Sequence, residues 1–210
     1  MEININRLSH KVLNDNAPEF SGAFFVTREK KIYLQLKKKM SIDFDSEETK
    51  KNVFEQTENY LETKELKIIS SDKERPWGGF FVIDENQSEK FISEYFPHLS
   101  KELLSGAGKL SPKILIVAPG KRLSWQYHHR RAEIWKLIGG EAAVTTSDTD
   151  EEKVNTILHK EDIIELKQGE RHRLIGTYGW GIVAEIWQHT DAGNPSNEND
   201  IVRVQDDFGR

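Results

Sequence analysis

Cysteine is absent from this chain of 210 residues. Disulfides, thiolate nucleophiles and thiolate metal sites are therefore excluded, and any metal must bind His, Asp, Glu or neutral oxygen and nitrogen ligands. Long apolar runs are absent too, since no segment approaches the roughly 20 residues of a membrane-spanning helix. The N-terminal sequence MEININRLSHKVLND also lacks the apolar core of a secretory signal. These absences predict a cytoplasmic protein.

An excess of positive charge is lacking as well. The chain has 30 Lys and Arg against 35 Asp and Glu, a net charge of −5, so neither nucleic acid nor an anionic membrane is expected as a partner. The composition is 36% hydrophobic, with five Trp and ten Phe, which is enough to build a core. The length predicts one domain with an appendage.

Residues 1–70 are expected to form an N-terminal extension of strands and one helix. The segment 22–36, GAFFVTREKKIYLQL, is typical of two strands around a charged turn. A helix is predicted at about 47–62, with Ser46 as its N-cap. Its apolar residues recur at about helical spacing: Val53, Phe54, Tyr60 and Leu61.

Residues 71–210 are expected to form a β-barrel domain. From Lys113 onward, short strand-like segments alternate with turn signals. They include KILIVAPG, EIWKLIGG, EAAVTTS, RHRLIG and GIVAEIWQ. Many short strands at regular spacing predict a sandwich or a barrel. The small size favours one closed or nearly closed barrel.

The stretch LSWQYHHRRAEIW carries most of the candidate ligands. Side chains alternate along a strand, so Gln126 and His128 point to the same side. A turn at HRRA would let Glu133 approach the same point from the next strand. His172, just after the turn KQGE, is the fourth candidate.

Gln126, His128, Glu133 and His172 together offer two imidazoles, one carboxylate and one amide oxygen. This set suits one borderline divalent ion, with Zn²⁺ preferred and Fe²⁺, Mn²⁺, Co²⁺ or Ni²⁺ as alternatives. Such an ion can polarise a carbonyl or hydroxyl oxygen. His129 points the other way on a regular strand, so a supporting or structural role is expected for it.

Several motifs around these residues resemble a known family. PGKRLSWQYHHRRAEIWKLIGG resembles the first cupin motif, and IIELKQGERHRL resembles the second. Gln in place of the first His resembles the phosphomannose isomerases. RPWGG (Arg75–Gly79) and NDIVRVQDDFGR (Asn199–Arg210) resemble motifs of the C-terminal isomerase domain of the bifunctional mannose-6-phosphate isomerase/mannose-1-phosphate guanylyltransferase proteins, the type II isomerases. The resemblance covers about residues 75–210.

The resemblance implies a mainly β cupin fold, a double-stranded β-helix or jelly-roll barrel. It implies the same four metal ligands and an enzyme of carbohydrate metabolism that interconverts mannose-6-phosphate and fructose-6-phosphate, an aldose–ketose isomerisation. The expected partner is a small-molecule sugar phosphate, and a homodimer is a candidate assembly.

Four arginines are kept as site candidates because family motif and expected geometry agree: Arg122, Arg131, Arg203 and Arg210. Arg131 and Glu133 are expected to be catalytic, and Arg122 and Arg203 to bind substrate, since a planar guanidinium matches phosphate. Arg131 would lie in the turn between the ligand strands, and Arg122 would share the inward face with the ligands. The proton-transfer base stays open between Glu133, whose basicity a metal would lower, and a metal-bound hydroxide.

The C-terminal tail DDFGR is expected to take part in the site. Phe208 would anchor the tail on the barrel, and Gly209 would allow a close approach. Arg210 would then reach the sugar-phosphate pocket as a third catalytic residue.

The sequence departs from the family pattern at several points. Arg130 stands where a third His is usual, Ile134 where a His usually follows the Glu, and Lys167 where Pro is typical. Residues 91–110 look inserted. These departures motivate alternatives: a non-catalytic cupin that binds a sugar or sugar phosphate, or a cupin isomerase of another free or phosphorylated sugar. An oxygenase is a further alternative, against which the C-terminal signature argues.

Overall fold

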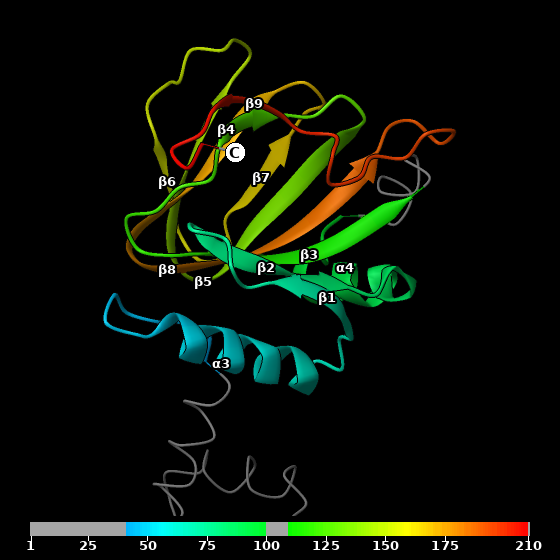
Figure 1. The fold of residues 1–210 in the computed structure, drawn as a ribbon. Helices are drawn as coiled ribbons and strands as arrows, with labels where there is room; N and C mark the ends of the chain where they lie inside the picture. The colour runs from blue at the N-terminus through cyan, green and yellow to red at the C-terminus, as the bar shows by residue number, and fades with distance from the viewer. Residues whose placement is uncertain (1–40, 100–108, 210) are drawn as a thin grey trace, which may run out of the picture. The chain divides into compact units, whose positions relative to one another are not determined.

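One curled antiparallel sheet carries the fold in the computed structural model, which describes residues 41–99 and 109–209 (Figure 1). These residues belong to a single compact unit, Lys39–Arg210. The predicted fold class is confirmed, because the unit is mainly β and its sheet curls into a cupin-type barrel. The strands predicted at 22–36 lie outside the described residues.

The strands pair in a continuous antiparallel pattern. They are β1 (Ile68–Asp72), β2 (Gly78–Ile83), β3 (Leu110–Val117), β4 (Trp125–Tyr127), β5 (Arg131–Ser147), β6 (Thr156–Leu158), β7 (Ile163–Leu166), β8 (Arg171–His189) and β9 (Val202–Gln205). The order is β1-β2-β3-β8-β4-β9, and β5 pairs with β6, β7 and β8. Strand β8 is therefore shared: it pairs with β3, β4 and β5.

The two longest strands bend without ending. The division of EIWKLIGG from EAAVTTS was wrong, because both belong to β5, and RHRLIG and GIVAEIWQ likewise form one strand, β8. The register between β5 and β8 shifts on both sides of Gly139 and Gly140. Gly140 has a φ of +66°, a backbone conformation that glycine adopts without strain. The glycine pair thus forms a bulge that bends the strand where a turn was predicted.

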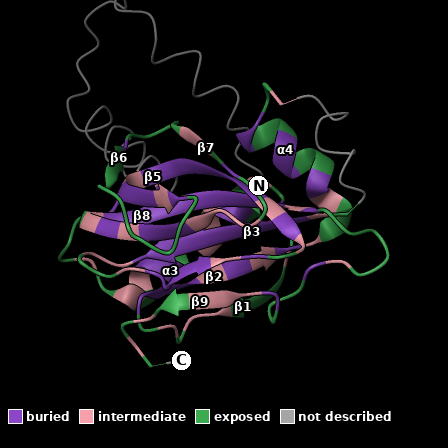
Figure 2. Ribbon diagram, turned by 90° about the horizontal axis from the view of Figure 1, so that it is seen from above, coloured by how far each residue is buried: buried purple, intermediate pink, exposed green. Residues whose placement is uncertain are grey.

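The central strands bury both of their faces, as the purple ribbons of Figure 2 show. Strand residues alternate between faces. On β8, Val183 faces an inner apolar core, and Glu185 and Trp187 line a cavity on that side. The alternate residues join an outer apolar core: Ile182, Ala184 and Ile186. A strand that is buried on both faces usually consists almost entirely of apolar residues. Glu185 is unusual because it is a buried acidic residue in such a strand.

Helices cover the outer core. The chain forms α3 (Lys50–Thr63), the short 3₁₀ helix η1 (Glu85–Gln87) and α4 (Ser88–Tyr95). Helix α3 begins later than predicted because Thr49 rather than Ser46 is its N-cap: its side chain accepts a hydrogen bond from Asn52 N. Val53, Phe54 and Leu61 of α3 and Phe91 and Ile92 of α4 are buried in the outer core. No helix among residues 41–99 and 109–209 is long and apolar enough to cross a bilayer.

The C-terminal tail is held on the barrel. Strand β9 pairs with β4, and Phe208 packs against the inner core, so the predicted anchoring role of Phe208 is confirmed. The Arg122 guanidinium donates two hydrogen bonds to Asp207, at 2.6 and 2.9 Å. Arg210 lies outside the described residues.

We predict that Gly140→Ala destabilises the fold far more than Gly120→Ala. Both glycines have nearly the same positive φ, +66° and +65°, so both variants carry a backbone cost of about 1–2 kcal/mol. A Cβ at Gly140 would lie 1.7 Å from the Trp180 carbonyl oxygen, whereas none of the described atoms lies within 4 Å of one at Gly120. The free energy of unfolding from urea titration should fall by a further 2 kcal/mol or more, roughly, in Gly140→Ala. Equal losses in the two variants would contradict the close approach.

Candidate metal centre

Three of the four predicted ligands meet inside the barrel. The side-chain ligand atoms of His128, Glu133 and His172 all lie within 4.8 Å of one another, and all three residues are buried. His128 follows β4, Glu133 is the third residue of β5, and His172 is the second residue of β8. The turn was predicted at HRRA; a bend at His129 and Arg130 separates the two strands, and Arg131 and Ala132 already belong to β5. Glu133 reaches the same point as His128.

Gln126 lies on the same wall. It pairs in register with His172 across β4 and β8 and lines the cavity described below. Its Oε1 accepts a hydrogen bond from Ser124 Oγ at 2.6 Å. Its assignment as a fourth ligand stays a prediction.

Backbone carbonyls set the tautomer of both histidines. His128 Nδ1 lies 2.5 Å from the Asp200 carbonyl oxygen, and His172 Nδ1 lies 2.9 Å from that of Glu170. A carbonyl only accepts, so each Nδ1 carries the proton and each Nε2 presents a lone pair. Burial lowers the pKa of His128 to about 3 and also lowers the pKa of His172. Both rings are therefore neutral at pH 7, the form that binds metal.

His172 Nε2 is the atom that most clearly calls for a ligand. It is fully buried and, within residues 41–99 and 109–209, has no hydrogen-bond partner; Glu133 Oε2 lies 3.5 Å away. Leaving a buried polar atom unsatisfied costs about 1–3 kcal/mol. Two neutral imidazoles and a carboxylate whose ligand atoms lie this close together fit one divalent ion.

Arg131 is the main cationic neighbour of this group. Its Nε donates to Glu133 Oε1 at 2.7 Å, and its Nη2 lies 3.1 Å from His128 Nε2. Burial would raise the pKa of Glu133, but the polar and charged groups of His128, Arg131 and His172 outweigh it and hold that pKa well below its usual range. Glu133 is thus a carboxylate. A metal that takes the lone pair of His128 must displace the contact with Arg131.

Glu185 is a functional candidate that was not predicted from the sequence. The Trp135 indole N–H lies 3.1 Å from Glu133 Oε2 and 2.9 Å from Glu185 Oε1, so it bridges the two carboxyl groups. Burial and the nearby charge of Glu133 raise the pKa of Glu185 to about 8. A single acidic residue within the apolar segment GIVAEIWQ was the available signal.

A cavity of about 400 Å³ opens beside the group. Gln126, Glu133 and Glu185 line it. Four cationic side chains also line it: Arg75, Lys113, Arg131 and Arg203. Arg131 and Arg203 were predicted as site residues, and their roles there stay predictions; Arg131 is the first residue of β5 and does not lie in a turn. Arg75 and Lys113 were not anticipated.

One predicted site residue is not brought to this cavity, and another lies outside the described residues. Arg122 pairs with Asp207 and approaches Glu152 at 3.9 Å, and it does not line the cavity. Arg210 lies outside the described residues. Their proposed substrate contacts stay predictions. His129 is exposed and packs its ring edge-on against Tyr127 with centroids 5.3 Å apart, away from the ligands.

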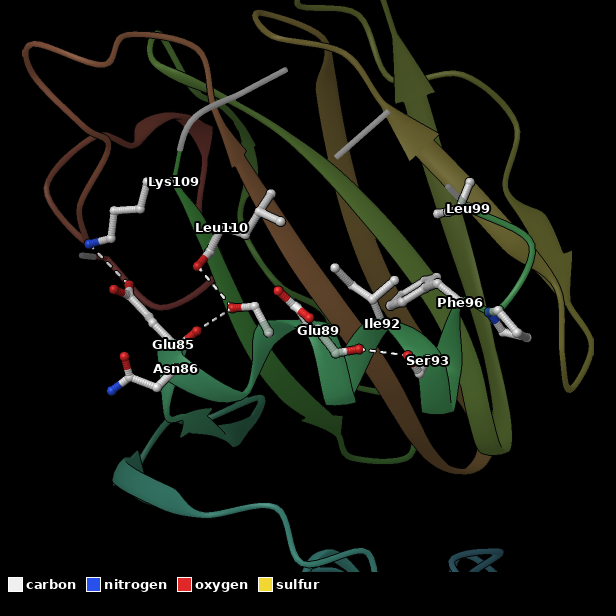
Figure 3. A pocket seen from close by; sticks show the side chains of 11 residues that line it. Glu85, Asn86, Glu89, Ile92, Ser93, Phe96, Leu99, Lys109 and Leu110 are labelled. Carbon is white, nitrogen blue, oxygen red and sulfur yellow. Dashed lines mark hydrogen bonds and ion pairs between the residues drawn. The ribbon is translucent and has the colours of Figure 1, made fainter. Parts of the chain in front are cut away.

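A second cavity, of about 480 Å³, lies beside α4 (Figure 3). Figure 3 shows Ile92 and Phe96 along one side of it, and Glu85 at the other. Glu85 pairs with Lys109 at 3.0 Å. None of the candidate metal ligands lines this cavity, so it is separate from the site.

The barrel and its buried His–Glu–His group define a cupin with a candidate metal centre. Residues 88–206 match the family model described as mannose-6-phosphate isomerase C-terminal. The chain belongs to this family.

The relatives that the chain resembles are longer proteins. It is 30% identical to the alginate biosynthesis protein AlgA of Pseudomonas aeruginosa over 156 residues, which cover 71% of this chain and 31% of AlgA. It is 33% identical to a mannose-1-phosphate guanylyltransferase of Sinorhizobium fredii over 133 residues, 63% of this chain and 20% of that enzyme. The chain thus spans a third or less of these relatives. Among solved structures, a cupin 2 conserved barrel domain protein from Salinispora arenicola aligns with a TM-score of 0.33 and 25% identity, over 40% of this chain and 64% of that one.

We predict that the purified protein binds about one divalent ion per chain and that His128→Ala/His172→Ala abolishes binding. Two of the three clustered donors are then lost, which leaves too few for tight binding. His129→Ala is the matched control, since this neighbouring histidine is exposed and should leave metal content unchanged. Metal content by mass spectrometry decides the matter, and a double variant that retained its metal would overturn the site.

We also predict a pH dependence of stability that arises from Glu185. Its pKa is raised from 4.5 to about 8 in the folded protein, so between these values the folded state holds a proton that the unfolded chain releases. The Glu185 contribution to the free energy of unfolding should therefore fall as pH rises through this window, by about 1.4 kcal/mol per pH unit. Glu185→Gln cannot ionise and should remove this fall.

The comparison requires chelator-treated protein, so that bound metal does not alter the charge around Glu133. Urea titrations of the parent and of Glu185→Gln at intervals from pH 5 to 8 give the difference directly. Parallel pH profiles would show that Glu185 is ionised throughout.

Proposed function

We propose that this protein is a metal-dependent aldose–ketose isomerase of a phosphorylated sugar, with mannose-6-phosphate and fructose-6-phosphate as the substrate pair. One observation carries the proposal: two imidazole lone pairs and Glu133 converge at the wall of a cavity that four cationic side chains line. Membership of the mannose-6-phosphate isomerase C-terminal family supports the same reaction class.

His128, Glu133 and His172, with Gln126 as a fourth donor, would hold the ion. Once bound, a divalent ion polarises a carbonyl or hydroxyl oxygen of the sugar and stabilises charge that develops there. Arg131 supports the same task, because its guanidinium is buried beside Glu133 and faces the cavity. Its fixed hydrogen bonds keep the carboxylate in one orientation.

An aldose–ketose isomerisation must move a proton between adjacent carbons. Glu133 is a weak base in this environment, since its pKa is held below its usual range. Glu185 is the better candidate for this step: it lines the cavity and its pKa of about 8 lies near neutrality, where a general acid or base works best. The Trp135 bridge fixes the position of its carboxyl group relative to Glu133.

A non-catalytic binding role is the second candidate, and the departures at Arg130 and Ile134 were its motivation. Ile134 is buried in the outer core, on the far side of β5 from the ligands. Arg130 donates to the Asn194 side chain at 2.5 Å and approaches Asp200 at 3.7 Å. Neither lines the cavity. The two departures therefore leave the proposed chemistry in place.

The direct test is proton NMR of mannose-6-phosphate in deuterated water with the metal-loaded protein. Fructose-6-phosphate should form, and deuterium should enter at C1 or C2 if the proton exchanges with solvent during transfer. Free mannose should not react, because it lacks the phosphate that the cationic cavity would hold. Glu185→Gln should lower turnover by roughly tenfold or more, within the range ascribed to general acid–base catalysis.

The alternatives give different results in the same experiment. Saturable binding of mannose-6-phosphate without conversion would favour the non-catalytic role. Conversion of free mannose, or of another sugar phosphate at a higher rate, would replace the proposed substrate. Full activity in the metal-free His128→Ala/His172→Ala variant would exclude metal dependence.

A further inference from the structure

A buried ammonium group is built into the wall of the cavity beside the metal ligands. Lys113 lies on β3 and only 4% of its surface is exposed. Its Nζ lies 3.6 Å from the centre of the Trp187 ring and 4.9 Å from that of Phe80. The aromatic faces favour a cation, but a buried charge still requires an anion beside it.

The anion is at present a carboxylate of the protein itself. Lys113 Nζ pairs with Glu198, which belongs to the segment between β8 and β9. The two partners differ in burial: the Lys113 side chain is 5% exposed and that of Glu198 is 59% exposed. The cation is thus fixed by the sheet, whereas the carboxylate reaches in from the surface. Glu198 can return to solvent when another anion takes its place beside Lys113.

The charges of the cavity leave room for a stronger anion. Arg75 and Arg203 line the same cavity as Lys113. Arg75 also pairs with Asp72, and Arg131 with Glu133, each at 2.7 Å. If Glu198 moves out, Lys113 loses its paired carboxylate and its ammonium group is left for another anion. A phosphate group carries up to two negative charges and three strong acceptor oxygens, so it suits such a position better than one carboxylate.

The spacing also suits a sugar phosphate. Lys113 pairs in register with Glu185 on β8, and Glu185 pairs with Trp135 on β5, the strand of Glu133. The backbones that carry Lys113 and Glu133 are therefore two strand spacings apart, about 10 Å. This is comparable to the length of a six-carbon sugar phosphate, whose reacting end would lie at the metal group.

We propose that Glu198 is an internal substitute for phosphate, and that the phosphate group of the sugar substrate displaces it and binds Lys113. This rests on the proposed function for the identity of the ligand. It adds Lys113 as a binding residue and Glu198 as a competitor that keeps the cation paired until substrate arrives.

Isothermal titration calorimetry with mannose-6-phosphate, inorganic phosphate and free mannose tests the proposal. Glu198→Gln removes the competing charge from an exposed side chain, so both phosphate ligands should bind about tenfold more tightly. Lys113→Met should weaken both by more than tenfold. Free mannose should respond to neither variant, since it lacks the group that Lys113 would contact.

The chain offers a matched control in the pair of Lys136 and Glu161. Here too a buried lysine of the sheet pairs with an exposed glutamate: the Nζ–Oε2 distance is 2.6 Å, and the side chains are 10% and 66% exposed. Neither residue lines the candidate site. Glu161→Gln should therefore leave the affinity for every ligand unchanged. An equal gain in this variant would attribute the effect to net charge and overturn the proposal.

The outcomes separate this proposal from the proposed function. Lys113-dependent binding of mannose-6-phosphate without conversion would support the phosphate position and refute the isomerase. Unchanged or weaker phosphate binding in Glu198→Gln would refute the displacement, whatever the turnover. This result does not depend on how well Lys113→Met folds. Binding of inorganic phosphate but not of mannose-6-phosphate would also refute it.

Discussion

The buried carboxylate of Glu133 is the constraint on which the site depends. An isolated carboxylate in a protein interior is strongly disfavoured, so its surroundings must supply hydrogen bonds and positive charge. Arg131 and Trp135 donate to its two oxygens, and the two histidines lie against it. These groups come from β5, from β8 and from the residue after β4, so the barrel must close for the charge to be tolerated.

The alternation of side chains lets one sheet serve two incompatible environments. The outer face of β3, β5 and β8 is apolar and is covered by α3 and α4. The inner face carries charged and aromatic groups in adjacent rows, among them Lys113, Glu185 and Trp187. Because the helices and the outer core contribute apolar burial, the inner face can hold polar groups that would not by themselves stabilise a fold.

The sequence predicted the parts of the site that follow from local geometry. Alternation and a turn were enough to bring Glu133 to His128, and His172 was the fourth candidate from its place after the turn KQGE. The chain-wide pairing of strands could not be predicted in this way. Lys113 and Glu185 become cavity residues only because β3 and β8 pair in one register. Arg122 illustrates the reverse case, because its guanidinium turns to Asp207, a partner 85 residues away.

The groups that orient the two histidines are backbone oxygens, those of Glu170 and Asp200. A carbonyl oxygen is present whatever side chain the residue carries, and it neither gains nor loses a proton in the range where the protein folds. The orientation of each ring therefore depends on the backbone conformation at Glu170 and Asp200 and not on the side chains that these residues carry. A change of side chain at either position can therefore reach the imidazole only by altering the backbone path.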